Sequence, residues 1–186
     1  MRQHAFTTRF NRPMRVLLTK VGVCLPITLE EAKTQQVKLN QYIAIWDTGA
    51  THSAITKKVA DDLDLKPTGI AEVRYGSGKQ STNTYLVNIS LPNGVMVGRV
   101  RVTEVQLTPD ANIPEDQQAQ VLIGMDIIGM GDFAVTNANG KTTLSFCVPS
   151  TKEIDFVPEA SETNVMEGGN RQQRREFEAK KRKGLT

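Results

Sequence analysis

One stretch of the sequence combines residue types suited to catalysis, Asp47-Thr48-Gly49-Ala50-Thr51. It directly follows the apolar run 42–46, which has the length and composition of a buried strand. Placing a carboxylate beside a buried strand costs free energy unless it is hydrogen-bonded or its pKa shifts. The hydroxyl and glycine that follow are suited to holding the carboxylate in a tight loop, facing a ligand, where it can act as a general acid or base. The other interpretation is a turn that only caps the strand.

The elements around this stretch are predicted from periodicity. Residues 56–65 carry apolar residues at helical spacing, which predicts a short amphipathic helix that ends before Pro67. Residues 121–123 form a second buried strand that ends at Gly124. Asp126 lacks a following Thr-Gly pair, and we expect it to cap the start of a helical turn.

Hairpin signals account for most of the remaining body. Gly76-Ser77-Gly78 fits a hairpin tip, Asn93-Gly94 joins two alternating segments, and Asn139-Gly140 joins residues 133–136 to 143–146. With a further strand at the start, residues 16–157 read as a mostly β domain. No strands alternate with long helices, which argues against a doubly wound sheet.

Taken in order, the Asp47 segment, the helix after it, the 76–78 hairpin and residues 121–128 resemble the retropepsin-like aspartic proteases. The resemblance covers roughly residues 16–148. It implies an all-β acid-protease barrel with one or two short helices and a flap hairpin, functional as a homodimer. Viral members commonly carry arginine where this chain has Met125, so it is closer to the cellular and bacterial relatives. The viral-type terminal strands have no clear match in the sequence.

Roles for individual residues follow from the resemblance alone. The implied catalytic residues are Asp47, Thr48 and Gly49. The implied flap residues, which bind substrate, are Tyr75, Gly76, Ser77 and Gly78. The implied supporting residues are Ala50, Ile123 and Gly124.

The resemblance implies an aspartic endopeptidase, a hydrolase without cofactor or metal. This chemistry needs two aspartates that share a proton, and the chain has one Asp-Thr-Gly. A homodimer would supply the second Asp47, and an extended peptide or protein substrate would lie between the copies. The alternative is a catalytically silent module of the same fold that dimerises or binds peptides, with basic tails contacting nucleic acid.

Charge divides the 186-residue chain into three parts. Residues 1–15 form a basic N-terminal extension with a net charge of +4, whereas residues 16–170 carry −6 and residues 171–186 carry +5. We expect a protease domain over 16–157 and a polar, basic tail over 158–186, with a solvated helix over 171–183. The tail is either a solubilising segment or a nucleic-acid contact.

Several classes of protein are excluded by what the sequence lacks. The chain is too short for an enzyme with two large lobes, and no apolar run reaches the roughly 18 residues that cross a bilayer. The start of the chain does not read as a secretory signal. Cys24 and Cys147 lie far apart without metal-ligand spacing, which favours a reduced state. We therefore expect a cytoplasmic protein without membrane contact.

Overall fold

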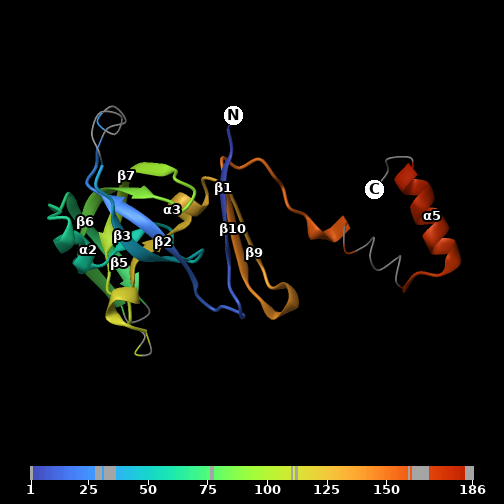
Figure 1. The fold of residues 1–186 in the computed structure, drawn as a ribbon, viewed down its shortest axis with the longest axis horizontal. Helices are drawn as coiled ribbons and strands as arrows, with labels where there is room; N and C mark the ends of the chain where they lie inside the picture. The colour runs from blue at the N-terminus through green and yellow to red at the C-terminus, as the bar shows by residue number, and fades with distance from the viewer. Residues whose placement is uncertain are drawn as a thin grey trace. The chain divides into compact units, whose positions relative to one another are not determined.

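The computed structural model describes residues 2–27, 31, 37–75, 78–109, 111, 113–158, 160 and 168–182 (Figure 1). The chain divides into two compact units, Met1–Thr151 and Lys152–Thr186. The elements of the first unit are β1 (His4–Arg9), β2 (Leu17–Cys24), β3 (Asn40–Trp46), β4 (Ala54–Ile55), α2 (Lys57–Asp62), β5 (Gly69–Tyr75), β6 (Gly78–Ser90), β7 (Met96–Glu104), η1 (Glu115–Gln117), β8 (Ala119–Ile123), α3 (Met125–Ile128), β9 (Asp132–Thr136), η2 (Ala138–Gly140) and β10 (Thr143–Val148). The predicted mostly β fold with few short helices is confirmed.

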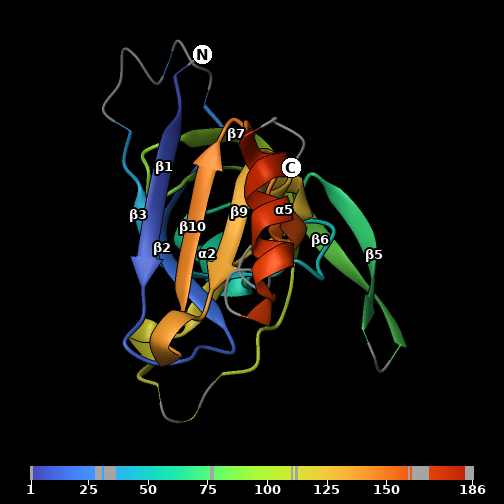
Figure 2. The same cartoon turned by 90° about the vertical axis from the view of Figure 1, so that its right-hand side faces the viewer.

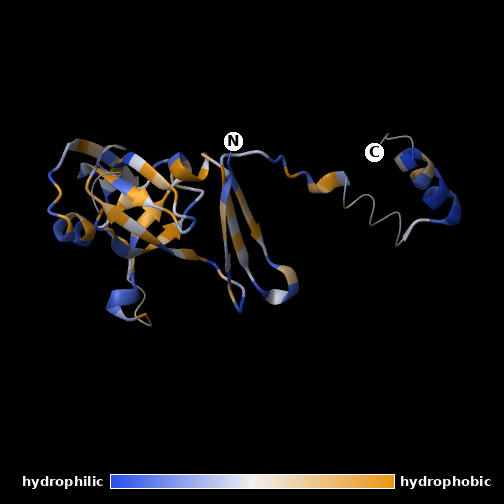
Figure 3. Cartoon of the chain, turned by 45° about the horizontal axis from the view of Figure 1, so that its top comes forward, coloured by the Kyte–Doolittle hydropathy of each residue, from blue (hydrophilic) through white to orange (hydrophobic). Residues whose placement is uncertain are grey.

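The larger sheet closes into a barrel. Its strand order is β2-β3-β8-β4-β7-β6-β5, and an additional pairing of β2 with β6 joins six of these strands in a ring. Strand β5 lies outside the ring, on β6. Strand β3 shows how the sequence builds the wall, because Tyr42, Ala44 and Trp46 are buried and the two isoleucines between them face the other way. The apolar colour concentrates inside the barrel (Figure 3).

A second sheet joins the two ends of the unit in the order β1-β10-β9. The sequence assigned residues 4–9 to a basic extension, whereas the structure places them in β1, paired with β10. The physical reason is alternation, since every second side chain of β1 is half-buried and Phe6 packs against the core. Three phenylalanines lie side by side in register across this sheet, Phe6, Phe146 and Phe133.

These phenylalanines surround Trp46, the last residue of β3. Ring centroids lie 5.1 Å from Trp46 for Phe146, 5.7 Å for Phe6 and 5.8 Å for the stacked Phe133. The indole Nε1–H donates to the hydroxyl of buried Thr19 at 2.8 Å. The terminal sheet therefore packs on the residue that directly precedes Asp47.

The hairpins lie where the turn residues predict them. Gly94, between β6 and β7, has φ +78°, and Asn139 and Gly140, between β9 and β10, have φ of 55° and 69°. Strands β5 and β6 form the expected flap hairpin, whose register extends to the pair Tyr75 and Gly78 (Figure 2). The tip residues Gly76 and Ser77 lie outside the described part of the chain.

The second unit contains α5 (Arg171–Arg182), the helix expected near the C-terminus. Its start is fixed by a reciprocal cap, because the Asn170 side chain accepts from the Gln173 amide and the Gln173 side chain accepts from the Asn170 amide, both at 2.9 Å. The arginines of α5 are exposed. Contact of this helix with nucleic acid stays a prediction. Within the described residues, no helix is long and apolar enough to cross a membrane.

Candidate active site

Asp47 begins a tight loop at the end of β3; we call residues 47–53 the aspartate loop. The Asp47 amide donates to the carbonyl of Ile123 at 3.0 Å, which keeps the loop attached to the neighbouring parallel strand β8. The Asp47 carboxylate accepts a hydrogen bond from the Gly49 amide at 2.8 Å. This backbone donor orients the carboxylate. Because the side chain is only half-buried, a ligand can still reach it.

Gly124 allows α3 to lie against this loop. A Cβ atom at position 124 would lie 2.6 Å from the carbonyl carbon of His52 and 2.9 Å from the carbonyl oxygen of Ala50. Both are backbone atoms that cannot swing aside, so this contact requires glycine. The close approach lets the Met125 amide donate to the Ala50 carbonyl at 2.8 Å.

Ser53 and Asp126 complete the attachment with side chains. The Asp126 carboxylate accepts from the Ser53 amide at 3.0 Å and from the Ser53 hydroxyl at 2.7 Å. The same hydroxyl accepts from the Gly124 amide at 3.1 Å. Asp126 also accepts from the Ile127 amide, so the expected bond at the helix start exists, but Gly124 is the N-cap residue and Asp126 reaches across to the loop.

The structure brings most of the predicted site residues together. Thr48 and Gly49 are exposed in the aspartate loop, Ala50 is half-buried, and Ile123 is fully buried behind them. Gly124 follows Ile123 as the contact point of α3. The four flap residues are carried by the separate β5–β6 hairpin, two of them outside the described residues. The catalytic and substrate-binding roles of all these residues stay predictions.

Comparison with protein families identifies the chain. A family model described as "Aspartyl protease" matches residues 34–127, half of the chain. The chain belongs to the aspartyl protease family. The matched segment runs from before β3 through the aspartate loop to Ile127 in α3, so it contains the whole arrangement around Asp47. Membership of this aspartyl protease family confirms the resemblance drawn from the sequence and indicates a protease function.

Comparison with solved structures also finds a match. The crystal structure of a retropepsin-like aspartic protease from Rickettsia conorii matches with a TM-score of 0.43 and 14% sequence identity. The match covers 78% of this chain and 95% of that one. Among curated proteins, no sequence matches this aspartyl protease.

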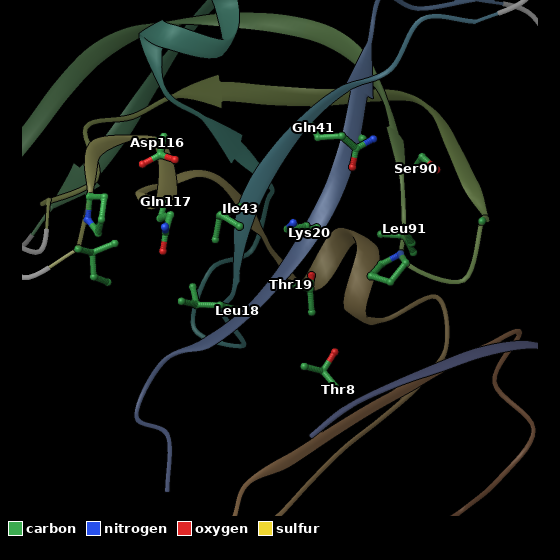
Figure 4. A pocket seen from close by; sticks show the side chains of 15 residues that line it. Thr8, Leu18, Thr19, Lys20, Gln41, Ile43, Ser90, Leu91, Asp116 and Gln117 are labelled. Atoms are coloured by element: carbon green, nitrogen blue, oxygen red, sulfur yellow. The ribbon is translucent and has the colours of Figure 1, made fainter. Parts of the chain in front are cut away.

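Two grooves lie on the outer face of β2 and β3. One, of about 1020 Å³, is shown in Figure 4, where Asp116 and Gln117 lie at one side, Ser90 and Leu91 at the other, and Ile43 and Lys20 between them. The other, of about 1100 Å³, contains Ile45 and extends to the N-terminal segment and to α2. Both are lined by Leu18, Ile113 and Gln117, so they adjoin.

Sequence reasoning missed two residues that build this site. Ser53 was not singled out, and Asp126 was assigned to its own helix. A signal exists in hindsight, because a lone serine precedes the apolar pair Ala54-Ile55 and is buried completely. A buried hydroxyl needs partners, and here the partners are Gly124, the N-cap residue of α3, and Asp126 in its first turn.

Proposed function

We propose that this aspartyl protease is an endopeptidase that hydrolyses peptide bonds as a homodimer, with Asp47 of each copy forming the catalytic pair. The observation that carries the proposal is the Asp47 carboxylate itself. It is half-buried, held by the Gly49 amide at 2.8 Å, and located in the segment that the family model matches. A carboxylate oriented in this way is suited to proton transfer with a bound water.

The reaction requires two carboxylates with one proton between them, because two adjacent negative charges repel. The ionised Asp47 takes a proton from water, and the water oxygen attacks the carbonyl carbon of the peptide. The protonated Asp47 of the other copy gives its proton to the carbonyl oxygen. The Asp47 that took the proton from water gives it to the amide nitrogen as the C–N bond of the tetrahedral diol breaks. A diol hydroxyl returns a proton to the other Asp47, which leaves an acid and an amine.

The dimer is required by the count of aspartates. The sequence contains a single Asp-Thr-Gly, so a twofold axis beside the aspartate loop is the simplest source of the second carboxylate. Thr48 and Gly49 are exposed in the single chain, as residues that meet the partner loop would be. We infer that the Thr48 hydroxyl bonds to the partner loop and that Gly49 permits the close approach.

The flap hairpin would cover the bound peptide. Among the described strands, β5 pairs with β6 alone, so the hairpin extends from the ring as a two-stranded arm. We infer that Tyr75 to Gly78 close over an extended substrate, whose backbone pairs in the manner of a strand.

The direct test compares Asp47→Asn with the parent protein on a peptide library at mildly acidic pH. We expect a loss of about a thousandfold or more in kcat/KM, since the carboxylate is a reacting group. The matched control is Asp64→Asn, because the Asp64 side chain is 87% exposed and pairs with Lys66 outside the aspartate loop. Equal activity of Asp47→Asn and the parent would remove Asp47 from the mechanism.

The shared site is tested by mixing. When Asp47→Asn is added in excess to the parent protein, mixed dimers contain one carboxylate, and activity per parent chain should fall. Analytical ultracentrifugation under the same conditions should show dimers. An active protein that sediments only as a monomer would contradict the pair of Asp47 residues. A dimer that cleaves no peptide would favour the silent module.

A further inference from the structure

One of the two grooves is lined by Ile45, which precedes Asp47 by two residues in the sequence. Side chains alternate along a strand, so Ile45 leaves β3 on the face opposite the buried Trp46. Leu18 lies beside Ile45 in the β2–β3 register and lines the same groove. The groove therefore reaches the strand that leads into the aspartate loop, although no residue of that loop lines it.

The lining of this groove is largely apolar. Half-buried Leu107 and Val105, from the segment after β7, lie along it together with the two side chains of the sheet. Val16 also lines it and is 45% exposed, so it adds accessible apolar surface to the groove. The volume, about 1100 Å³, exceeds that of most small-molecule pockets and fits several residues of a peptide.

Four cationic side chains line the groove, and two of them form ion pairs with carboxylates. Lys57 and Lys58 each pair with an aspartate of their own helix, at 2.6 Å and 2.8 Å. The hydrogen bond that Lys57 donates to Asp61 raises the pKa of Lys57, and the charge of Glu104 adds to this rise. The hydrogen bond that Lys58 donates to Asp62 raises the pKa of Lys58 in the same way.

Arg12 and Arg15 line the same groove, together with the carboxylates of Glu104 and Glu115. Both side chains are exposed, and no carboxylate among the described residues forms an ion pair with either of them. The pair of guanidinium groups thus presents a positive charge that is still available to a carboxylate, next to an apolar surface.

We propose that Arg12 and Arg15 are specificity-determining residues, and that this groove takes a segment of an extended peptide in which an acidic side chain neighbours an apolar one. The apolar side chain lies on Leu18 and Ile45, and the carboxylate meets the two arginines. The inference deepens the proposed function and rests on it in one respect, that the bound peptide is the substrate.

The test uses two octapeptide amides that differ at one position, Ala-Ala-Glu-Leu-Phe-Val-Ala-Ala and the same sequence with Lys in place of Glu. Binding is measured by fluorescence anisotropy on full-length Asp47→Asn, which does not consume the peptide, and cleavage on the parent protein. We expect roughly five- to tenfold tighter binding of the Glu peptide at low salt, as two exposed ion pairs would give. The same preference should appear in kcat/KM.

Charge reversal supplies the decisive variants. Arg12→Glu combined with Arg15→Glu should invert the preference toward the Lys peptide, and Arg12→Gln combined with Arg15→Gln should abolish it without inversion. The control is Arg9→Glu, which makes the same type of substitution once, at an exposed position of β1 that does not line the groove. Arg9→Glu should keep the preference for Glu.

The outcomes separate this inference from the proposed function. Equal binding of both peptides, or an equal response to Arg9→Glu, overturns the role of the groove even if both peptides are cleaved. A preference that inverts with charge reversal supports the role of the groove even if neither peptide is cleaved, in which case the proposed function fails alone.

Discussion

The two flanks of the dipeptide Trp46-Asp47 are held by different forces. On the Asp47 side, the aspartate loop is fixed to β8 and α3 by hydrogen bonds and by the close approach at Gly124. On the Trp46 side, the terminal sheet is fixed by aromatic packing, with three phenylalanine rings around one indole. Adjacent residues therefore belong to a polar, directional region and to an apolar, non-directional one.

This difference indicates how the chain separates stability from geometry. Apolar burial contributes most of the free energy of folding but tolerates small displacements, whereas hydrogen bonds contribute less and define positions. We expect changes in the terminal sheet to lower stability more than activity per folded molecule. Changes in the aspartate loop should do the opposite.

The largest effect on stability is expected for Phe146→Ala. Phe146 is fully buried and is the nearest ring to Trp46, so its loss leaves a cavity at the centre of the cluster. We expect a decrease of about 3–5 kcal/mol in the free energy of unfolding, measured by urea denaturation. Phe146→Leu is the milder control, because it keeps most of the apolar volume.

The same variant also tests the comparison through catalysis. At a temperature where Phe146→Ala is folded, kcat per folded molecule should stay within a few-fold of the parent value. A collapse of kcat in the folded variant would mean that aromatic packing also sets the position of Asp47.

Ser53→Ala should have a smaller effect on stability and a larger one on activity. The change leaves the Gly124 amide without its acceptor and removes the shortest bond to Asp126. We expect a loss of about 1–3 kcal/mol in the free energy of unfolding. The expected decrease in kcat/KM exceeds that of Phe146→Ala, and Ser53→Thr, which restores the hydroxyl, should recover part of it. Unchanged kcat/KM in Ser53→Ala would show that the attachment of α3 is dispensable.

The smallest effect is expected for Thr19→Val. This change keeps the shape of the side chain and removes the acceptor of the Trp46 indole N–H, a buried bond of 2.8 Å. We expect a decrease of about 1 kcal/mol in the free energy of unfolding and an altered tryptophan emission spectrum. Thr8→Val controls for replacing a threonine in a strand, since Thr8 lies in β1. A loss as large as that of Phe146→Ala would place the polar bond, and not the rings, at the centre of the cluster.

The sequence predicted the parts of this fold that depend on local patterns. Residues 42–46, 121–123 and the helix after the aspartate loop follow hydrophobic periodicity, and the structure has β3, β8 and α2 at these places. Asn93-Gly94 and Asn139-Gly140 marked turns because only a few residue types accept positive φ. Asp47 and Gly124 were selected by motif and are brought to one site.

Long-range pairings were beyond the sequence. Strand β1 reads as a basic extension because its pattern is short and its partner is remote, and Phe6 shows its role only when Trp46 lies beside it. The bonds of Asp126 were assigned within its own helix because capping is a local rule, whereas Ser53 is 73 residues away in the chain. Arg12 and Arg15 read only as charge until the segment after β7 placed an apolar surface beside them.

The pairing of β1 with β10 also sets an order of events during synthesis. Thr7 and Ser145 meet across this pair although 138 residues separate them in the chain. While the ribosome makes the protein, β1 and Trp46 emerge early and wait for nearly the whole unit before their cover exists. Contacts with such separation form slowly, so the terminal sheet closes last, on a barrel that has already been translated. We expect a nascent chain that stops short of β10 to leave Trp46 without the ring of Phe146, and so to expose this tryptophan more than the finished chain does.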